Sequence, residues 1–289
     1  MRIRFIVNPT SGTGKHKNLS KIIEQELDKT LFQYDIQHTE RSQHATELTQ
    51  QAIADGIDIV AAVGGDGTMN ECAKALTDSK TALAIIPCGS GNGFAFHFGM
   101  HKSLKKAIQQ LNHSGFRLVD SCTANEQPFF NVSGIGYDAH IAHLFSKLKK
   151  RGFANYMKLI LREFRYLTKE YTLRFDGQEK TVTAFGISWV NASQFGNNAV
   201  ISPESQVDDG LVDICVLGKF PARAIPKLLS RLFDNSMHHS KYMEIIRCNS
   251  MKISGGDGLA HLDGEPVELG AEIQLLVKPE SLKLFVPHG

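Results

Sequence analysis

A nearly continuous apolar run at residues 57–63 leads directly into the motif Gly64-Gly65-Asp66-Gly67-Thr68. Such a run is typical of a central strand that is covered on both faces, as in a parallel sheet. Residues 68–76 then show helical periodicity, so the motif is predicted to form the turn between a buried strand and a helix. The sequence around this turn therefore predicts an α/β architecture.

The same alternation of strand and helix extends through the first half of the chain. Short apolar runs at residues 3–7 and 83–86 predict two further strands. Residues 19–27 and 104–111 carry apolar side chains at the spacing of one helix face, which predicts two helices. We therefore predict an α/β domain at residues 1–122.

From residue 123 onward, short strands separated by turn residues replace this alternation. They predict a mainly antiparallel second domain at residues 123–289, with the last residues allowed to return to the first domain. Two helices are expected within it, near residues 139–150 and 156–171. A chain of 289 residues is long enough for two cores. The predicted strands lie at residues 129–132, 171–175, 181–190, 211–217, 245–253, 260–262, 273–278 and 282–286.

Charge and cysteine content narrow the class of protein. A net charge of +2 is too small to predict a general polyanion binder, so nucleic acid is not the expected partner. The five cysteines are scattered without a Cys-x-x-Cys motif, which favours reduced thiols over a disulfide or zinc framework. Together with an N-terminal apolar run too short for a secretory signal, this predicts a cytoplasmic protein.

The motif at residues 64–68 has the chemistry of a phosphate site. Its glycines allow backbone N–H groups to approach phosphate oxygens, and the following helix presents its positive N-terminal end. Asp66 would repel bare phosphate, but it suits the site if Mg²⁺ lies between the carboxylate and a triphosphate. The alternative is a simple strand-to-helix turn in which Asp66 or Thr68 caps the helix.

Two further loops follow predicted strands. Pro87-Cys88-Gly89-Ser90-Gly91-Asn92-Gly93 is a second glycine-rich segment, which by itself is equally consistent with a turn and with a ligand loop. Asn8-Pro9-Thr10-Ser11-Gly12-Thr13-Gly14-Lys15 is the third, but His16 after Lys15 breaks the P-loop pattern. The loops at residues 64–68 and 87–93 follow neighbouring strands, and together they are harder to explain as simple turns.

Five motifs in this order resemble the diacylglycerol kinase catalytic superfamily, which includes bacterial diacylglycerol kinases, sphingosine kinases and ceramide kinases. The resemblance implies a Rossmann-like N-terminal domain related to those of NAD kinases and phosphofructokinases, a C-terminal β-sandwich, and an active site between them. It also implies ATP as co-substrate and Mg²⁺ as cofactor. The motifs are Asn8-Pro9 with Ser11-Gly12, Gly64-Gly65-Asp66-Gly67-Thr68 with Asn70-Glu71, residues 87–95, Asp208-Asp209-Gly210-Leu211, and Asp263-Gly264-Glu265.

The resemblance also implies roles for individual residues. Glu265 matches the general base, and Asp66 matches the residue that organises Mg²⁺ and ATP. Asp209 would bind a metal in the second domain through its side chain, with the carbonyls of Gln206 and Leu211 beside it. The predicted ATP contacts are Asn8, Thr39, Gly64, Gly65, Asp66, Gly67, Thr68, Asn70 and Ser90.

The chemistry of these residue types agrees with the roles but does not require them. A carboxylate such as that of Glu265 can accept the proton of an alcohol as the bond to phosphorus forms. Residues 263–266 would otherwise be an ordinary hairpin with solvated carboxylates, and residues 208–210 an ordinary turn. The predicted function is ATP- and Mg²⁺-dependent phosphorylation of a lipid hydroxyl. An NAD kinase-type enzyme and a non-catalytic nucleotide-binding regulator are the alternatives.

One position departs from the family pattern and leaves the acceptor open. Gly93 follows Asn92, where bacterial diacylglycerol kinases usually have aspartate, and Gly-Ser-Gly-Asn looks more like sphingosine kinases. Diacylglycerol, a sphingoid base, a ceramide or another lipid alcohol are all retained as acceptors.

Basic residues are concentrated at residues 147–169. They predict peripheral contact with an anionic membrane surface, where the lipid substrate lies, although a solvated helix face is an equal alternative. A homodimer is left open. The basic residues are Lys147, Lys149, Lys150, Arg151, Lys158, Arg162, Arg165 and Lys169.

Overall fold

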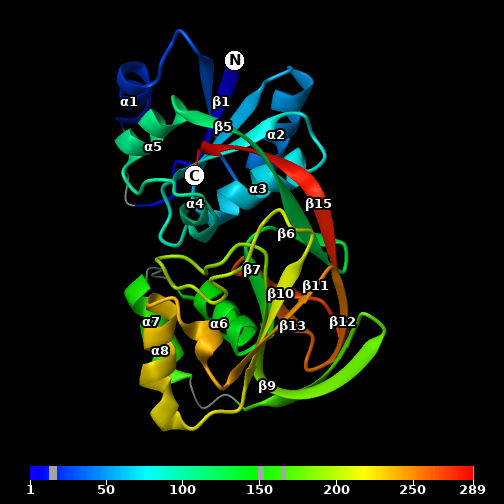
Figure 1. The fold of residues 1–289 in the computed structure, drawn as a ribbon. Coiled ribbons are helices and arrows are strands. Elements are labelled where there is room, and N and C mark those ends of the chain that lie inside the picture. The colour runs from blue at the N-terminus through cyan, green and yellow to red at the C-terminus, as the bar shows by residue number, and fades with distance from the viewer. Residues whose placement is uncertain (13–17, 149–152, 164–166, 289) are drawn as a thin grey trace. The chain divides into compact units, whose positions relative to one another are not determined.

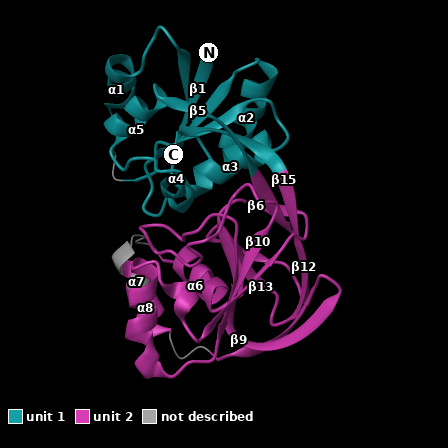
Figure 2. Cartoon of the chain, viewed as in Figure 1, with its two compact units in different colours: residues 1–119, 280–289 teal, residues 120–279 magenta. Residues whose placement is uncertain are grey.

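The computed structural model describes residues 1–12, 18–148, 153–163 and 167–288. The chain divides into two compact units, one of residues 1–119 with 280–289 and one of residues 120–279 (Figure 2). Two strands, β5 (Ser114–Ala124) and β15 (Glu272–Pro287), contain the points at which the chain passes from one unit to the other. The first boundary therefore lies within a strand, three residues before the predicted one at 122.

The first unit is built on a parallel sheet. Its strands run in the order β4 (Ala82–Pro87), β3 (Ile59–Gly64), β1 (Arg2–Val7) and β2 (Gln33–His38). Every residue of β3 and β4 is buried, as their apolar sequences predict for central strands. The end of β15 adds a further parallel partner to β4, with Leu284 opposite Leu83.

Helices cover both faces of this sheet (Figure 1). On one side α1 (Leu19–Glu26) packs against α5 (Leu104–Leu111), and on the other α2 (His44–Ala54) packs against α3 (Asp66–Leu76). The short α4 (Gly93–His97) follows the second glycine loop. Helix α3 begins at Asp66, two residues before the prediction, with Gly65 as N-cap. Asp66 and Thr68 are therefore wrong as cap residues, whereas the tight strand-to-helix turn of that alternative is present.

The second unit is mainly antiparallel, as predicted. The long strand β9 pairs with β8 along its first half and with both β7 and β10 along its second half. Trp189 of β9 and Tyr171 of β8 are fully buried in the main hydrophobic core of this unit. The strands are β6 (Gln127–Phe129), β7 (Val132–Gly136), β8 (Lys169–Phe175), β9 (Gln178–Val190), β10 (Val212–Gly218), β11 (Met243–Cys248), β12 (Ser250–Gly255), β13 (Leu259–Leu262) and β14 (Glu265–Glu268).

Three helices accompany these strands: α6 (Tyr137–Ser146), α7 (Phe153–Arg162) and α8 (Ile225–Phe233). The helix predicted at residues 156–171 is wrong in its last part, because Lys169 already begins β8. Helix α8 was not predicted, although Pro226 in its first turn is a helix-start signal. Within the described part of the chain, no helix combines the length and apolar character needed to cross a membrane.

Several predicted strand limits are corrected by the structure. The strand expected at 129–132 is two strands, because the amides of Phe130 and Asn131 donate to the carboxylate of Asp263 instead of joining one ladder. The strand expected at 245–253 is likewise split into β11 and β12, whereas the two expected at 273–278 and 282–286 form the single strand β15.

Candidate functional site

Three glycine-containing loops meet at the carboxyl edge of the parallel sheet in the first unit. The loop after β3 contacts the loop after β4, since Cys88 N donates to Gly64 O over 2.7 Å. A Cβ on Gly89 would lie 2.5 Å from Gly65 Cα, and a Cβ on Gly12 would lie 2.2 Å from Cys88 O. Only glycine permits these approaches, so the three loops bring their backbones close together, with Gly65 and Gly89 partly exposed.

Asn8 connects the first loop to the motif at residues 64–68. Its Nδ2 donates to Thr68 Oγ1 over 3.0 Å, and its Oδ1 accepts hydrogen bonds from the N–H and the hydroxyl of Thr10. The structure therefore brings together Asn8 and Thr68, two residues predicted to contact ATP from distant parts of the sequence.

Asp66 has a defined structural role that the sequence did not reveal. Its Oδ2 accepts the N–H of Asn92 over 2.9 Å and its Oδ1 accepts the N–H of Gly93 over 3.1 Å. Burial raises the pKa of this carboxyl, while these backbone hydrogen bonds oppose the rise. Because each carboxylate oxygen has a second lone pair, Asp66 can hold α4 and still offer an oxygen to a cation. The residue thus joins two glycine loops.

Two other predicted contacts are Thr39, which directly follows β2 at this edge, and Asn70, in the second turn of α3. Asn70 is 3% exposed, and its buried Oδ1 has no hydrogen-bond donor among the described residues. Thr39 is held directly after β2 by its N–H, which donates to Val7 O over 2.9 Å. Ser90 is exposed in the second glycine loop. A buried acceptor that has no donor among the described residues, on the helix that follows a glycine loop, fits a polar ligand such as a nucleotide.

Glu71 is a residue of this site whose role sequence reasoning missed. Its carboxylate accepts the backbone N–H groups of Gln43, over 3.0 Å, and Ala45, over 3.1 Å. These groups lie at the N-terminus of α2, where Gln43 has a φ of 65° and no side-chain cap is present. Glu71 therefore caps α2 from α3 and fixes the loop that begins at Thr39. The Asn70-Glu71 pair of the motif was the available signal.

Glu265 lies in the second unit, at the start of β14. The preceding residues Asp263 and Gly264 have φ values of 50° and 86°, so they form the two-residue turn of a hairpin with β13. The side chain of Glu265 is exposed. The hairpin considered as an alternative is therefore present, and it presents the predicted base to solvent.

Asp263 anchors this hairpin. Its carboxylate accepts the N–H groups of Phe130, over 2.9 Å, and Asn131, over 2.8 Å, and its own N–H donates to Ser133 Oγ. Gly264 N donates to Nδ1 of His261, a buried imidazole whose pKa is lowered by burial to about 4. The turn before Glu265 is thereby held at several points, which limits the positions that Glu265 can take.

The predicted metal ligands lie in the loop before β10. Asp209 Oδ1 accepts the N–H of Leu211, and its Oδ2 lies 3.6 Å from the Arg247 guanidinium, which is fixed by a 2.8 Å ion pair with Asp213. No cluster of three or more His, Cys, Asp or Glu side chains suited to a metal is found in the described ranges. One carboxylate with carbonyl oxygens fits a hard cation that keeps several waters, such as Mg²⁺.

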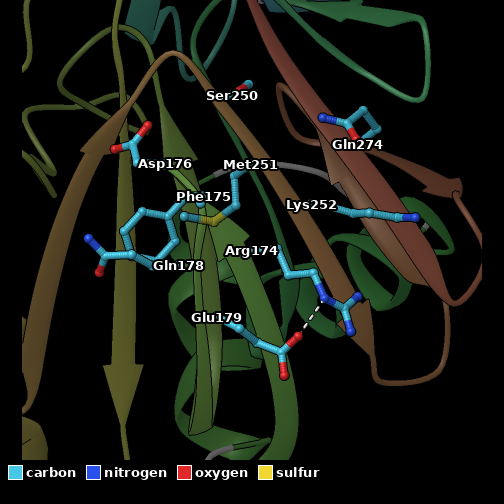
Figure 3. A pocket seen from close by; sticks show the side chains of 10 residues that line it. Arg174, Phe175, Asp176, Gln178, Glu179, Ser250, Met251, Lys252 and Gln274 are labelled. Atoms are coloured by element: carbon cyan, nitrogen blue, oxygen red, sulfur yellow. Dashed lines mark hydrogen bonds and ion pairs between the residues drawn. The ribbon is translucent and has the colours of Figure 1, made fainter.

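A pocket of about 440 Å³ lies elsewhere in the second unit (Figure 3). The hairpin of β8 and β9 lines it together with β12, and Arg174 pairs with Glu179 across it over 2.7 Å. In the strand order, β13, β7 and β9 separate β14 from β8. Because β14 carries Glu265 and does not line this pocket, the pocket is not evidence for the predicted base.

Comparisons with known proteins agree on one family. Residues 2–124 match the domain described as "Diacylglycerol kinase catalytic domain", and residues 131–286 match the "YegS C-terminal NAD kinase beta sandwich-like domain". The chain is 30% identical to a "Probable lipid kinase YegS-like" of Pseudomonas aeruginosa, over 85% of this chain and 82% of the relative. It is 25% identical to a "Diacylglycerol kinase" of Bacillus subtilis, over 91% and 89%.

Solved structures show the same similarity. A protein from Bacillus anthracis, provisionally named a diacylglycerol kinase, superposes with a TM-score of 0.80 at 26% identity. The superposition covers 99% of this chain and 96% of the other. The predicted fold class, an α/β domain followed by an antiparallel β-sandwich, is thereby confirmed.

Proposed function

Because the chain belongs to the diacylglycerol kinase catalytic superfamily, we propose that it transfers the terminal phosphate of ATP to the hydroxyl group of a lipid. The family supports an ATP-dependent lipid kinase as the class of enzyme. The observation that supports the proposal in this chain is the meeting of three glycine loops, followed on α3 by the buried Oδ1 of Asn70, which accepts no hydrogen bond from the described residues. Such an arrangement offers backbone N–H groups to phosphates and an acceptor to a ligand hydroxyl or amine.

In this proposal the first unit binds ATP through the residues predicted to contact it. The amides of residues 64–68 and the N-terminal end of α3 hold phosphate oxygens, and Asn8, Thr39, Asn70 and Ser90 contact the rest of the nucleotide. Asp66 would hold Mg²⁺, which neutralises charge on the triphosphate when it is bound. The link from Asp66 to Asn92 and Gly93 supports this, because it keeps both loops in place before ATP arrives.

Glu265 is the proposed general base. It accepts the proton of the lipid hydroxyl while the hydroxyl oxygen forms a bond to the terminal phosphorus and the bond from that phosphorus to the bridging oxygen of ADP breaks. The products are the phosphorylated lipid, ADP and the protonated glutamate, which then returns its proton to water. The rigid turn built by Asp263 supports this role, because a base must be held within reach of one proton.

A second cation is proposed at Asp209, with the carbonyls of Gln206 and Leu211. The nearby Arg247 already balances part of the Asp209 charge, so the cation would bind with few protein ligands and many waters. Its proposed role is to order the loop before β10.

The acceptor is proposed as diacylglycerol, a sphingoid base, a ceramide or a related lipid alcohol. Relatives carry the names lipid kinase and diacylglycerol kinase, while Gly93 after Asn92 resembles the sphingosine kinase pattern. A labelled-ATP assay with diacylglycerol, sphingosine, ceramide and NAD side by side tests the proposal. Phosphate on one of the lipids supports it, and phosphate only on NAD would establish the NAD kinase alternative. Tight ATP binding without transfer to any acceptor would establish the regulator.

We also propose a cytoplasmic protein that contacts the membrane peripherally. Of the predicted basic residues, Arg162 pairs with Glu163 and Lys169 pairs with Asp257. Lys147 and Lys158 are also described, whereas Lys149, Lys150, Arg151 and Arg165 lie outside the described residues. The charges of Arg162 and Lys169 are thus partly balanced within the protein. Other cations of the second unit are therefore better suited to contact an anionic membrane.

A further inference from the structure

Apolar residues lie on two neighbouring stripes along α8 and the Ala224 that precedes it. Ala224, Leu228 and Leu232 recur at every fourth residue, and they pack against the core cluster around Val190, Cys215 and Met237. A second stripe, turned by about 100° around the helix, contains Ile225, Leu229 and Phe233. Ile225 and Leu229 are half-buried and Phe233 is 44% exposed. Part of the Phe233 ring is therefore exposed at the end of α8.

The same segment concentrates positive charge. Residues 219–241 contain five lysines and arginines and one acid, a net charge of +4, whereas the whole chain has +2. The rest of the chain therefore sums to −2. Lys219, Arg223 and Lys227 are exposed, and none of them takes part in an ion pair among the described residues. These charges are thus available to an anionic partner.

We propose that α8 with its flanking residues, 219–241, docks the protein onto an anionic lipid bilayer. This inference rests on the proposed function, because a kinase acting on membrane lipids must approach a bilayer. The residues of this segment match such a surface, because apolar side chains can enter the boundary between headgroups and acyl chains while the flanking cations remain at the phosphates. Figure 1 shows α8 as a yellow helix of the second unit.

Vesicle co-sedimentation of the full chain tests the proposal. Vesicles of phosphatidylcholine mixed equally with phosphatidylglycerol are compared with vesicles of phosphatidylcholine alone. The unaltered protein is expected to bind the anionic vesicles and to lose most of this binding when salt rises from about 0.05 M to about 0.5 M. The double variant R223E/K227E should bind at least about tenfold more weakly.

Matched controls separate docking from general charge effects. The double variant K21E/K106E makes the same change of charge on exposed helices of the first unit and should bind the vesicles as the unaltered protein does. Phe233→Ser should weaken binding about threefold or more, whereas Leu118→Ser, at a side chain 47% exposed on β5, should not. Thermal unfolding of each variant shows whether the fold is retained.

The outcomes distinguish this inference from the proposed function. Transfer of phosphate to lipid in neutral detergent micelles should be unchanged in R223E/K227E, since no membrane charge is present there. Absence of transfer by the unaltered protein in micelles would contradict the proposed function, whatever the vesicles show. Equal vesicle binding by the unaltered protein and R223E/K227E would overturn the docking proposal. The docking proposal would also be overturned if the unaltered protein did not bind vesicles and instead formed a dimer that Phe233→Ser disrupts.

Discussion

The two units build their parts of the proposed reaction in different ways. In the first, the ligand surface is made of backbone, and side chains such as Asp66 and Glu71 are used to hold backbone N–H groups in place. In the second, the working group is a side chain, Glu265, and neighbouring side chains fix the turn that carries it. A phosphate site thus needs several backbone N–H donors that point to the same place, whereas a general base needs one side chain held at one position.

The largest expected effect is on the single side chain of the second unit. Glu265→Gln should lower kcat by about 10³-fold, because glutamine cannot accept the proton, while ATP affinity stays within about twofold. Turnover and nucleotide binding are measured on the same preparation. Glu268→Gln, an exposed residue of the same strand, is the control and should keep normal turnover. Near-normal turnover in Glu265→Gln would remove the residue from the reaction.

Asp66→Asn should affect both chemistry and fold in the first unit. Asparagine keeps one acceptor oxygen, and its NH₂ group would face the N–H of Asn92 or Gly93. We expect kcat to fall by about 10²-fold and the free energy of unfolding to fall by about 1–3 kcal/mol. Kinetics and urea unfolding measure the two effects. Lost turnover with unchanged stability would assign Asp66 to catalysis alone and would weaken the contrast between the units.

We expect the stability of the protein to depend on pH through His261, which accepts a hydrogen bond from the turn before Glu265. Burial lowers the pKa of His261 to about 4 in the folded protein, below its ordinary value near 6.5. The unfolded chain therefore binds more protons, so stability is complete above about pH 6.5 and is lost as pH falls toward 4, by up to about 3 kcal/mol.

His261→Asn tests this pH dependence, because its amide oxygen can accept the Gly264 N–H without titrating. The free energy of unfolding between pH 7 and 4 is compared for the two proteins. The same loss in both would show that other groups cause it.

The smallest effect is expected at Glu71. Glu71→Gln keeps an oxygen for one of the two N–H groups at the start of α2, so the loop after Thr39 should loosen rather than unfold. KM for ATP should rise about tenfold, with kcat and KM for the lipid nearly unchanged. Glu71→Ala should give a larger rise in the same constant. A fall in kcat without change in KM for ATP would mean that Glu71 does not position the nucleotide loop.

Much of the fold could be predicted from local patterns. The apolar runs of β3 and β4 and the spacing of α5 identify the parallel sheet and one of its helices, and the short strands after residue 123 identify the antiparallel unit. The errors lie where a tertiary contact overrides the local pattern. Asp263 separates β6 from β7 by binding two amides, and neither partner is near it in the sequence.

The sequence by itself determined which loops follow the strands and where their glycines and carboxylates stand, because periodicity and turn chemistry act over a few residues. Only the tertiary structure decided what those carboxylates hold. Asp66 and its partner Asn92 are 26 residues apart, and Asp263 and Phe130 are 133 apart. Hydrogen bonds of such separation depend on how strands and helices pack, and no local pattern records that packing.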